Sequence, residues 1–233
     1  MPDKKSKVDK WLERETDHKR KALENASRHF DGDDSFTVNT LEGIYGVESS
    51  FGVNRRKRGM SGAAGDFQLE KETAKRMGLL TSKENDQRFD VDEASAASAK
   101  YLKILDTLFM KQKNLGSKLH TIPVMSRTER KKCTLAAYNA GEGRISKAQM
   151  LAKEDGKDPE KWDHVKEYLG AAGASPAKVK EIKNYVDSVL ENANEFSEKS
   201  KASKRAKYLA PKKIKTKHGH WITKDGRRIL IED

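Results

Sequence analysis

GIYGVESSFG, residues 43–52, contains a carboxylate on what an α-helix would make an apolar face. Glu48 shares that face with three apolar residues at helical spacings of seven, four and three: Leu41, Ile44 and Tyr45. Such a face is expected to pack against a core. A carboxylate placed there must either be paired or be kept out of water for a chemical purpose.

The composition limits the size of any compact core. The 233 residues are 35% hydrophobic and 36% charged, so one substantial domain with appendages is expected. No segment approaches the ~20 consecutive apolar residues of a membrane span. Residues 1–21 lack the apolar segment of a secretory signal, which predicts synthesis in the cytoplasm without a signal peptide. Cys133 is the single cysteine, which excludes an internal disulfide and a Cys-based zinc site.

Positive charge is concentrated at the C-terminal end. The chain has a net charge of +12, and residues 198–233 contain twelve Lys and Arg against four Asp and Glu. A basic tail of this kind predicts an anionic polymer as partner, such as the cell wall, nucleic acid or a virion component. The alternative is a solubilising tail without a partner.

Periodicity and composition divide the chain into four segments. A charged helical extension, expected to attach loosely, covers residues 1–32, and an all-α domain covers 33–196. A basic linker follows over 197–217, and a C-terminal β-hairpin over 218–233. The hairpin prediction rests on two β-prone runs around Asp225-Gly226, a dipeptide that favours a two-residue turn.

Start and stop signals delimit helices within the all-α domain. An N-terminal cap is expected from Ser, Asp or a residue that precedes proline, and Gly141 is expected to end a helix. The predicted starts lie at Asp90 or Asp92, at Ser126, at Asp158-Pro159 and at Ser175-Pro176.

Four motifs follow one another in the chain: VESSF at 47–51, SGAAGDFQLEKETAKRMGL at 61–79, AAYNAG at 136–141 and IKNYVDSVL at 182–190. Together they resemble the soluble lytic transglycosylase domain, a family related in fold to the goose-type lysozymes. The resemblance covers about residues 35–192. It implies a lysozyme-like all-α fold with a cleft, no cofactor, and peptidoglycan as substrate, cut between N-acetylmuramic acid and N-acetylglucosamine.

The resemblance also implies which residues form the site. Glu48 matches the single catalytic acid, and Gln68 matches the glutamine of a Gly-x-x-Gln motif. Tyr138 and Asn139 match cleft residues, and Tyr185 matches a tyrosine near the catalytic carboxyl group. Each of the last four has a simpler explanation: helix capping for Gln68, part of a helix end for Tyr138, a turn for Asn139 and a core position for Tyr185.

The chemistry requires an acid at the leaving oxygen of the glycosidic bond. A free Glu has a pKa of about 4.3 and is mostly ionised at neutral pH. Apolar surroundings such as Leu41 and Ile44 would raise the pKa of Glu48 toward roughly 6. The structural alternative is an ion pair between Glu48 and Arg55 or Arg56.

Hydrolysis ordinarily requires a second carboxylate. The resemblance implies a route without one, in which the muramyl N-acetyl group assists and the 6-hydroxyl closes a 1,6-anhydro ring, with Glu48 as acid and then base. Asp66 and Glu70 stand where the family commonly has Leu and Met, and Gly59 where it often has Ser. Asp66 or Glu70 could therefore be the second carboxylate of a muramidase, or a solvent-facing charge.

The sequence predicts no metal site, because His218 and His220 flank one glycine without further ligands. The leading hypothesis is a peptidoglycan-degrading enzyme that reaches the wall or periplasm after lysis, by injection or by non-classical export. That setting corresponds to a phage-type lysin or a virion-associated protein. The competing hypothesis is a non-enzymatic virion or nucleic-acid-binding protein on a lysozyme-like fold.

Overall fold

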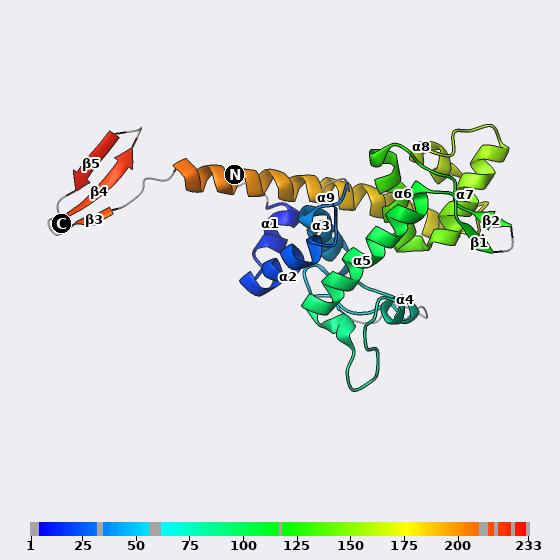
Figure 1. Cartoon of the computed structure of the whole chain (residues 1–233), viewed down its shortest axis with the longest axis horizontal. Helices are drawn as coiled ribbons and strands as arrows, with labels where there is room; N and C mark the ends of the chain where they lie inside the picture. Colours follow the sequence, from blue (N-terminus) through cyan, green and yellow to red (C-terminus); the bar gives the residue numbers. More distant parts are fainter. Residues whose placement is uncertain are drawn as a thin grey trace. The chain divides into compact units, whose positions relative to one another are not determined.

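The computed structural model describes residues 5–31, 35–55, 62–116, 118–209, 214–216, 219–224 and 227–231. The chain is mostly helical and divides into two units, Met1–Phe196 and Ser197–Asp233 (Figure 1). The helices are, in chain order, α1 (Lys7–Leu12), α2 (Asp17–Ser27), α3 (Val38–Ser49), α4 (Lys71–Arg76), α5 (Val91–Met110), α6 (Arg127–Ala140), α7 (Glu142–Glu154), α8 (Trp162–Val165) and α9 (Pro176–Leu209). Two short 3-10 helices are η1 (Gln87–Phe89) and η2 (Lys166–Tyr168).

Helix α3 has the buried face that its spacing predicts. Leu41, Ile44 and Tyr45 are fully buried in the core. The helix ends where Ser50 and Phe51 adopt left-handed backbone angles, with φ of 52° and 58°. The chain therefore turns sharply just after Glu48.

The N-terminal helices belong to the first unit, contrary to the expected loose attachment. Trp11 of α1 is 6% exposed, and its ring stacks on both Phe51 and Phe196, at centroid distances of 6.2 and 6.3 Å. A Cβ atom at Gly46 of α3 would lie 2.4 Å from this ring, so only glycine permits the contact. Leu23 of α2 is also fully buried. A few large side chains thus anchor a segment whose periodicity is weak.

The carboxyl groups of Glu15 and Glu42 lie close to each other. Glu42 of α3 is 3% exposed, and burial together with the nearby charge of Glu15 raises the pKa of Glu42 to about 7. Burial also raises the pKa of Glu15, whose carboxylate pairs with Arg20 at 2.8 Å. Glu42 does not line the cavity that contains Glu48.

Most of the predicted helix boundaries are confirmed. Asp90 rather than Asp92 caps α5, accepting the backbone N–H of Asp92 at 2.9 Å. Ser126 caps α6, and Gly141 ends it with φ of 84°. Helix α9 begins at Pro176.

One expected helix start is wrong, and one helix was not predicted. Asp158-Pro159 does not start a helix: the Asp158 side chain accepts the backbone N–H of Glu160 at 3.0 Å, as in an Asx turn, and α8 begins only at Trp162. Helix α7 was not expected. It begins at Glu142, directly after the glycine that ends α6.

Strands are few and short. In the first unit, β1 (Asn114–Gly116) pairs antiparallel with β2 (Leu119–His120). In the second unit, helix α9 continues through Leu209 into the segment expected to be a linker. The second unit also contains a three-stranded sheet, in which β4 (Gly219–Lys224) pairs antiparallel with β3 (Ile214–Thr216) and with β5 (Arg227–Ile231). Lys224 lies opposite Arg227. Asp225-Gly226, the expected turn, lies outside the described residues, as do Gly59 and His218.

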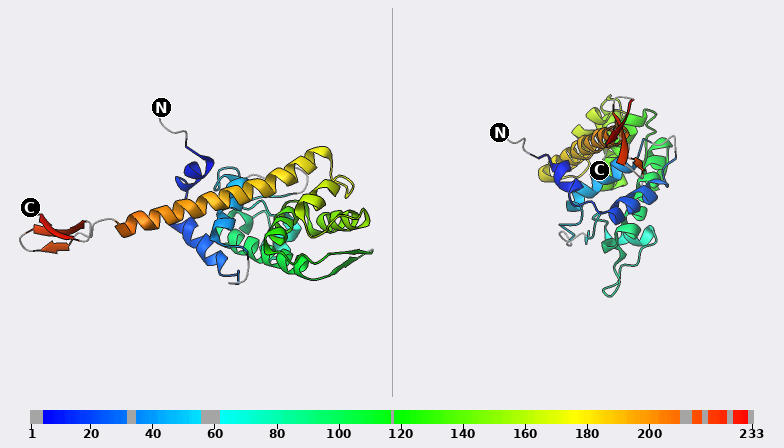
Figure 2. Two further views of the ribbon diagram at one scale, coloured as in Figure 1. Left: turned by 90° about the horizontal axis from the view of Figure 1, so that it is seen from above. Right: turned by 90° about the vertical axis from the view of Figure 1, so that its left-hand side faces the viewer.

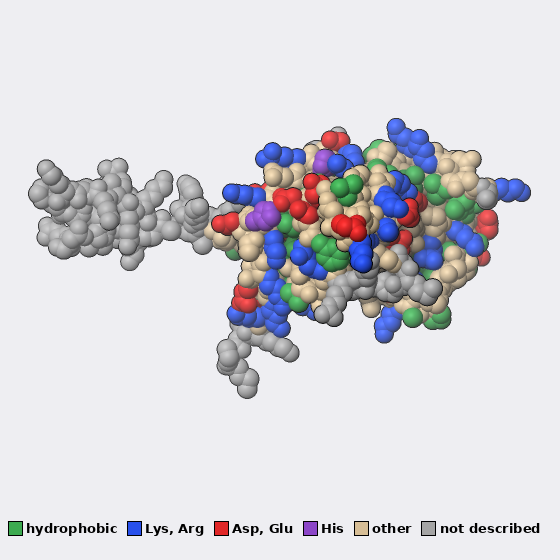
Figure 3. All heavy atoms as spheres, turned by 90° about the horizontal axis from the view of Figure 1, so that it is seen from below, with side chains coloured by type: hydrophobic (Ala, Val, Ile, Leu, Met, Phe, Trp, Pro, Cys, Tyr) green, Lys and Arg blue, Asp and Glu red, His purple; other side chains and the backbone are tan. Residues whose placement is uncertain are grey.

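Helix α9 runs along one side of the first unit, as Figure 2 shows. Gly43 of α3 packs against Val189 of α9, and this contact brings α9 beside the helix that carries Glu48. On the face drawn in Figure 3, acidic and basic side chains are intermixed rather than segregated. Within the described ranges, no helix has the length and apolar character of a membrane span.

Candidate active site

A cavity of about 760 Å³ contains the five residues that the sequence singles out as catalytic or substrate-binding. Its walls come from α3, α4 and the loop before it, α5, the junction of α6 with α7, and α9. The predicted residues that line it are Glu48, Gln68, Tyr138, Asn139 and Tyr185. Positions up to 137 residues apart in the sequence therefore meet at one place.

Glu48 lies in the last turn of α3 and is 9% exposed. Its position places a carboxyl group between the fully buried face of α3 and the cavity. Arg55, one of the two expected ion-pair partners, is bound to Asp66 instead. Arg56, the other one, lies outside the described residues.

The charge of Glu48 affects the pKa of two tyrosines, Tyr138 and Tyr185. The rings of Tyr138 and Tyr185 stack with centroids 6.5 Å apart. Burial, and then the charge of Glu48, raise the pKa of both hydroxyl groups well above the usual value, so both remain neutral. The Tyr185 hydroxyl is buried beside the Glu48 carboxyl group, and hydrogen bonding to Glu48 also contributes to its raised pKa.

The Tyr138 hydroxyl has a structural task. It donates to the Phe67 carbonyl at 3.2 Å and accepts from the Ser98 hydroxyl at 3.0 Å. These bonds tie the loop that carries Gln68 to helix α5. Tyr138 therefore contributes its ring to the cavity, while its hydroxyl fixes the loop.

Gln68 combines a strained backbone with an unused acceptor. Its φ is 46°, a left-handed conformation that costs a non-glycine residue on the order of 1 kcal/mol. The side-chain Nε2 donates to the Gly65 carbonyl at 2.8 Å, which fixes the amide orientation because a carbonyl only accepts. The Oε1 atom is buried and has no hydrogen-bond partner among the described residues. Since Glu70, not Gln68, occupies the N-cap position of α4, helix capping does not explain this residue.

The loop over residues 62–70 is held by Arg88 of η1. The buried Arg88 guanidinium donates to the carbonyls of Gly62 at 2.5 Å and Leu69 at 3.1 Å. The Arg88 carbonyl accepts the backbone N–H of Asp66 at 3.1 Å. Gly65, with φ of 82°, packs so closely that an added Cβ would lie 1.7 Å from that carbonyl oxygen.

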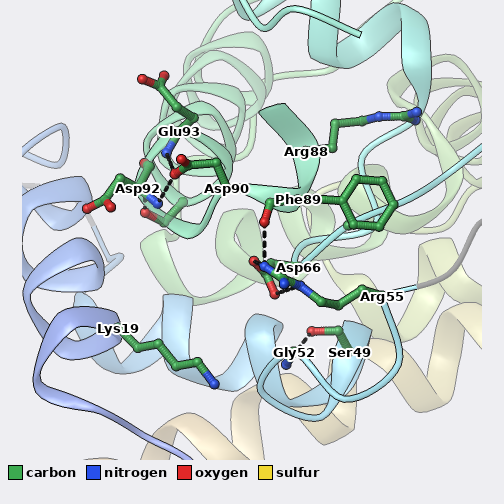
Figure 4. Close-up of polar contacts among 12 residues, drawn as sticks. Lys19, Ser49, Gly52, Arg55, Asp66, Arg88, Phe89, Asp90, Asp92 and Glu93 are labelled. Atoms are coloured by element: carbon green, nitrogen blue, oxygen red, sulfur yellow. Dashed lines mark hydrogen bonds and ion pairs between the residues drawn. The ribbon is translucent and has the colours of Figure 1, made fainter. Parts of the chain in front are cut away.

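Asp66, one of the two candidates for a second carboxylate, does not line the cavity. Figure 4 shows that its carboxylate lies against Arg55. Its fully buried carboxylate accepts from Arg55 Nε at 2.8 Å and from Arg55 Nη2 at 2.5 Å. The same Nη2 also donates to the Phe89 carbonyl at 2.5 Å. Asp66 is thus a structural partner of Arg55 and is not placed to serve as a second carboxylate. Glu70 does line the cavity.

The sequence analysis missed a cluster on the wall formed by α4, α5 and α7. Tyr101 donates to Glu142 at 3.3 Å, and Arg76 lies 3.5 Å from the other Glu142 oxygen. The Arg76 guanidinium also lies 5.4 Å from the centre of the Tyr101 ring. Burial and the Glu142 charge raise the pKa of Tyr101 above its usual value. Tyr101 fits the apolar period of α5, and Glu142 belongs to the unexpected α7, so neither gave a functional signal.

A second missed cluster lies on α9. Lys178 and Glu181 both line the cavity and both contact Asn139. The contact is visible only in the folded structure, where Asn139 lies beside α9. Among the residues that the structure describes, no group of His, Cys, Asp and Glu has the arrangement of a metal site.

Comparison with known proteins gives a consistent result. The chain is 31% identical over 109 residues to the membrane-bound lytic murein transglycosylase F of Marinobacter nauticus, which covers 47% of this chain and 18% of that protein. It is 31% identical over 116 residues to the protein of that name from Pseudoalteromonas translucida, covering 50% of this chain and 21% of that protein. The chain therefore spans only about a fifth of the length of these relatives.

The family comparison covers more of the chain. The family described as "Transglycosylase SLT domain" matches residues 32–161, which is more than half of the sequence. The match contains Glu48, Gln68, Tyr138 and Asn139, and it ends before Tyr185. The chain belongs to the transglycosylase SLT domain family.

Proposed function

We propose that this chain cleaves the glycan of peptidoglycan between N-acetylmuramic acid and N-acetylglucosamine, as a lytic transglycosylase. The observation that carries the proposal is Glu48, a carboxyl group 9% exposed that lines a large cavity together with Tyr185. Membership of the transglycosylase SLT domain family and the similarity to lytic murein transglycosylases support the same activity.

In the proposed reaction Glu48 is the only protein group that transfers protons. Its carboxyl group protonates the leaving glycosidic oxygen as the bond from C1 breaks. The N-acetyl carbonyl oxygen of the muramyl residue attacks C1 and forms a cyclic intermediate. The Glu48 carboxylate then removes the proton of the 6-hydroxyl, whose oxygen attacks C1, displaces the N-acetyl oxygen to regenerate the acetamido group, and closes the 1,6-anhydro ring. The proton gained by Glu48 restores the starting state.

The other residues of the cavity hold the substrate. The unused Gln68 Oε1 can accept from a substrate N–H, which would remove a desolvation cost of about 1–3 kcal/mol. The Tyr185 hydroxyl can donate to the Glu48 carboxylate or to a substrate oxygen that reacts at C1. The ring of Tyr138 and the amide of Asn139 complete the wall.

The second candidate is a muramidase that uses Glu70 as an additional carboxylate. Glu70 lines the same cavity, which favours this candidate over any that relies on Asp66. Digestion of purified glycan strands separates the two. The transglycosylase is expected to give products lighter by one water that resist borohydride reduction. Reducible muramic acid ends would instead assign hydrolysis, and Glu70→Gln would then abolish it.

The biological setting belongs to the same proposal. A phage-type lysin or a virion-associated wall-degrading protein fits a wall-active domain followed by a strongly basic tail. Detection of the chain in purified virions by mass spectrometry would support this setting. A chain that binds nucleic acid but leaves glycan strands intact would favour the non-enzymatic alternative.

A further inference from the structure

The Asn139 side chain has both ends of its amide engaged by helix α9. Its Oδ1 accepts from Lys178 Nζ at 3.1 Å, and its Nδ2 donates to Glu181 Oε1 at 3.2 Å. An ammonium group only donates and a carboxylate only accepts. The reversed amide would place N–H groups against the ammonium and the carbonyl against the carboxylate. Only one orientation of the Asn139 amide is therefore compatible with its neighbours.

Lys178 is held by three acceptors. Its Nζ donates to the Asn139 carbonyl at 3.2 Å, to Asn139 Oδ1 at 3.1 Å and to Glu181 Oε1 at 2.8 Å. These acceptors match the three hydrogens of an ammonium group. Its place on α9 is fixed as well, because its backbone N–H bonds to the Ser175 side chain that caps the helix. Lys178 has no further donor for a substrate, although it lines the cavity.

We propose that Lys178 and Glu181 are positioning residues that hold Asn139 in a single orientation for substrate. The two contacts leave Asn139 with one Nδ2 hydrogen and one Oδ1 lone pair. These groups suit the hydroxyl and acetamido groups of a glycan. The identity of the substrate rests on the proposed function. The arrangement of Asn139, Lys178 and Glu181, which we call the clamp, rests on these three side chains alone.

The test uses the full chain and four variants. Lys178→Met removes the ammonium group, Glu181→Ala removes the carboxylate, and Asn139→Ala removes the amide. Lys183→Met is the matched control: Lys183 lies on the same helix, pairs with Glu167 at 2.8 Å, and is 31% exposed against 29% for Lys178. Lys183 does not line the cavity.

Initial rates on soluble glycan strands give KM and kcat for each variant. Lys178→Met and Glu181→Ala should each raise KM about five- to tenfold, the effect of losing one oriented hydrogen bond, with kcat within about twofold. Lys183→Met should leave both unchanged. The double variant Lys178→Met with Asn139→Ala should match Asn139→Ala alone. Additive increases in KM, or an unchanged KM for Lys178→Met, would overturn the proposal.

A second measurement separates this proposal from the proposed function. In NMR spectra the Nδ2 proton of Asn139 that is bonded to Glu181 should exchange with solvent more slowly than its partner, and Lys178→Met should remove the difference. Failure of the wild-type chain to cleave glycan would refute the proposed function and leave this measurement valid. Equal exchange of the two protons in the wild-type protein would overturn the clamp.

Discussion

Replacing Trp11 by alanine tests whether the N-terminal helices belong to the folded unit that carries Glu48. Trp11 is 6% exposed and stacks on Phe51 and Phe196. Removing a buried tryptophan typically costs about 3–5 kcal/mol. The close contact between the ring and Gly46 of α3 limits how far the surroundings can collapse, so we expect about 4 kcal/mol. For a unit of this size that corresponds to a fall in Tm of roughly 8–16 °C.

Urea unfolding followed by circular dichroism measures the change in the free energy of unfolding. Lys10→Ala, on the exposed side of α1, serves as control and should change this free energy by less than ~0.5 kcal/mol. A loss below ~1 kcal/mol for Trp11→Ala would refute the reasoning and restore the loosely attached extension. Wall-clearing activity should fall with the fraction of folded protein, because Trp11 packs against Gly46, which lies two residues before Glu48 in α3.

Three further predictions concern the acid, the buried carboxyl pair and the tail. Glu48→Gln keeps the shape but removes the acid, so turbidity clearing of wall suspensions should fall at least ~100-fold, and near-normal clearing by a folded variant would contradict the assignment. Glu42 has a raised pKa of about 7, so the folded state binds its proton more tightly than the unfolded state, and stability should fall as pH rises from about 4.5 to 7 and then level off. Glu42→Gln should flatten this fall and raise the free energy of unfolding at pH 8 by roughly 2–3 kcal/mol, and an unchanged pH dependence in urea unfolding would count against it. Deleting residues 198–233 should weaken wall or nucleic-acid binding most at low salt while turnover of short soluble glycans survives, and loss of that turnover in a folded truncation would place the tail in the catalytic unit.

Local signals in the sequence were sufficient for the helix that carries the acid. The spacing of Leu41, Ile44 and Tyr45 predicts the buried face of α3. Ser126 predicts the start of α6, and the start of α5 is predicted to within the choice between Asp90 and Asp92. These features depend on residues within one or two helical turns of each other. Such short-range patterns are visible without knowledge of tertiary contacts.

The features that were missed depend on partners distant in sequence or on unusual boundaries. Gly141 ends α6 and directly precedes α7. A glycine is read as the end of a helix, so the start of α7 was not recognised. Asp66 pairs with Arg55, eleven residues earlier in the chain, and no local pattern indicates this pair. The clusters around Glu142 and Glu181 join different helices, and no spacing along the chain indicates such contacts.

The contacts of Arg88 have a consequence for protein engineering. The loop over 62–70 carries Gln68, and it is bonded to Arg88 through the carbonyls of Gly62 and Leu69 and through the N–H of Asp66. A chimera that imports this loop from another member of the family without the segment around Arg88 would bring in carbonyl groups that lack their donor. Exchange of substrate preference between relatives therefore requires both segments to be transplanted as one module. Libraries that vary the loop should leave Gly65 and Arg88 constant.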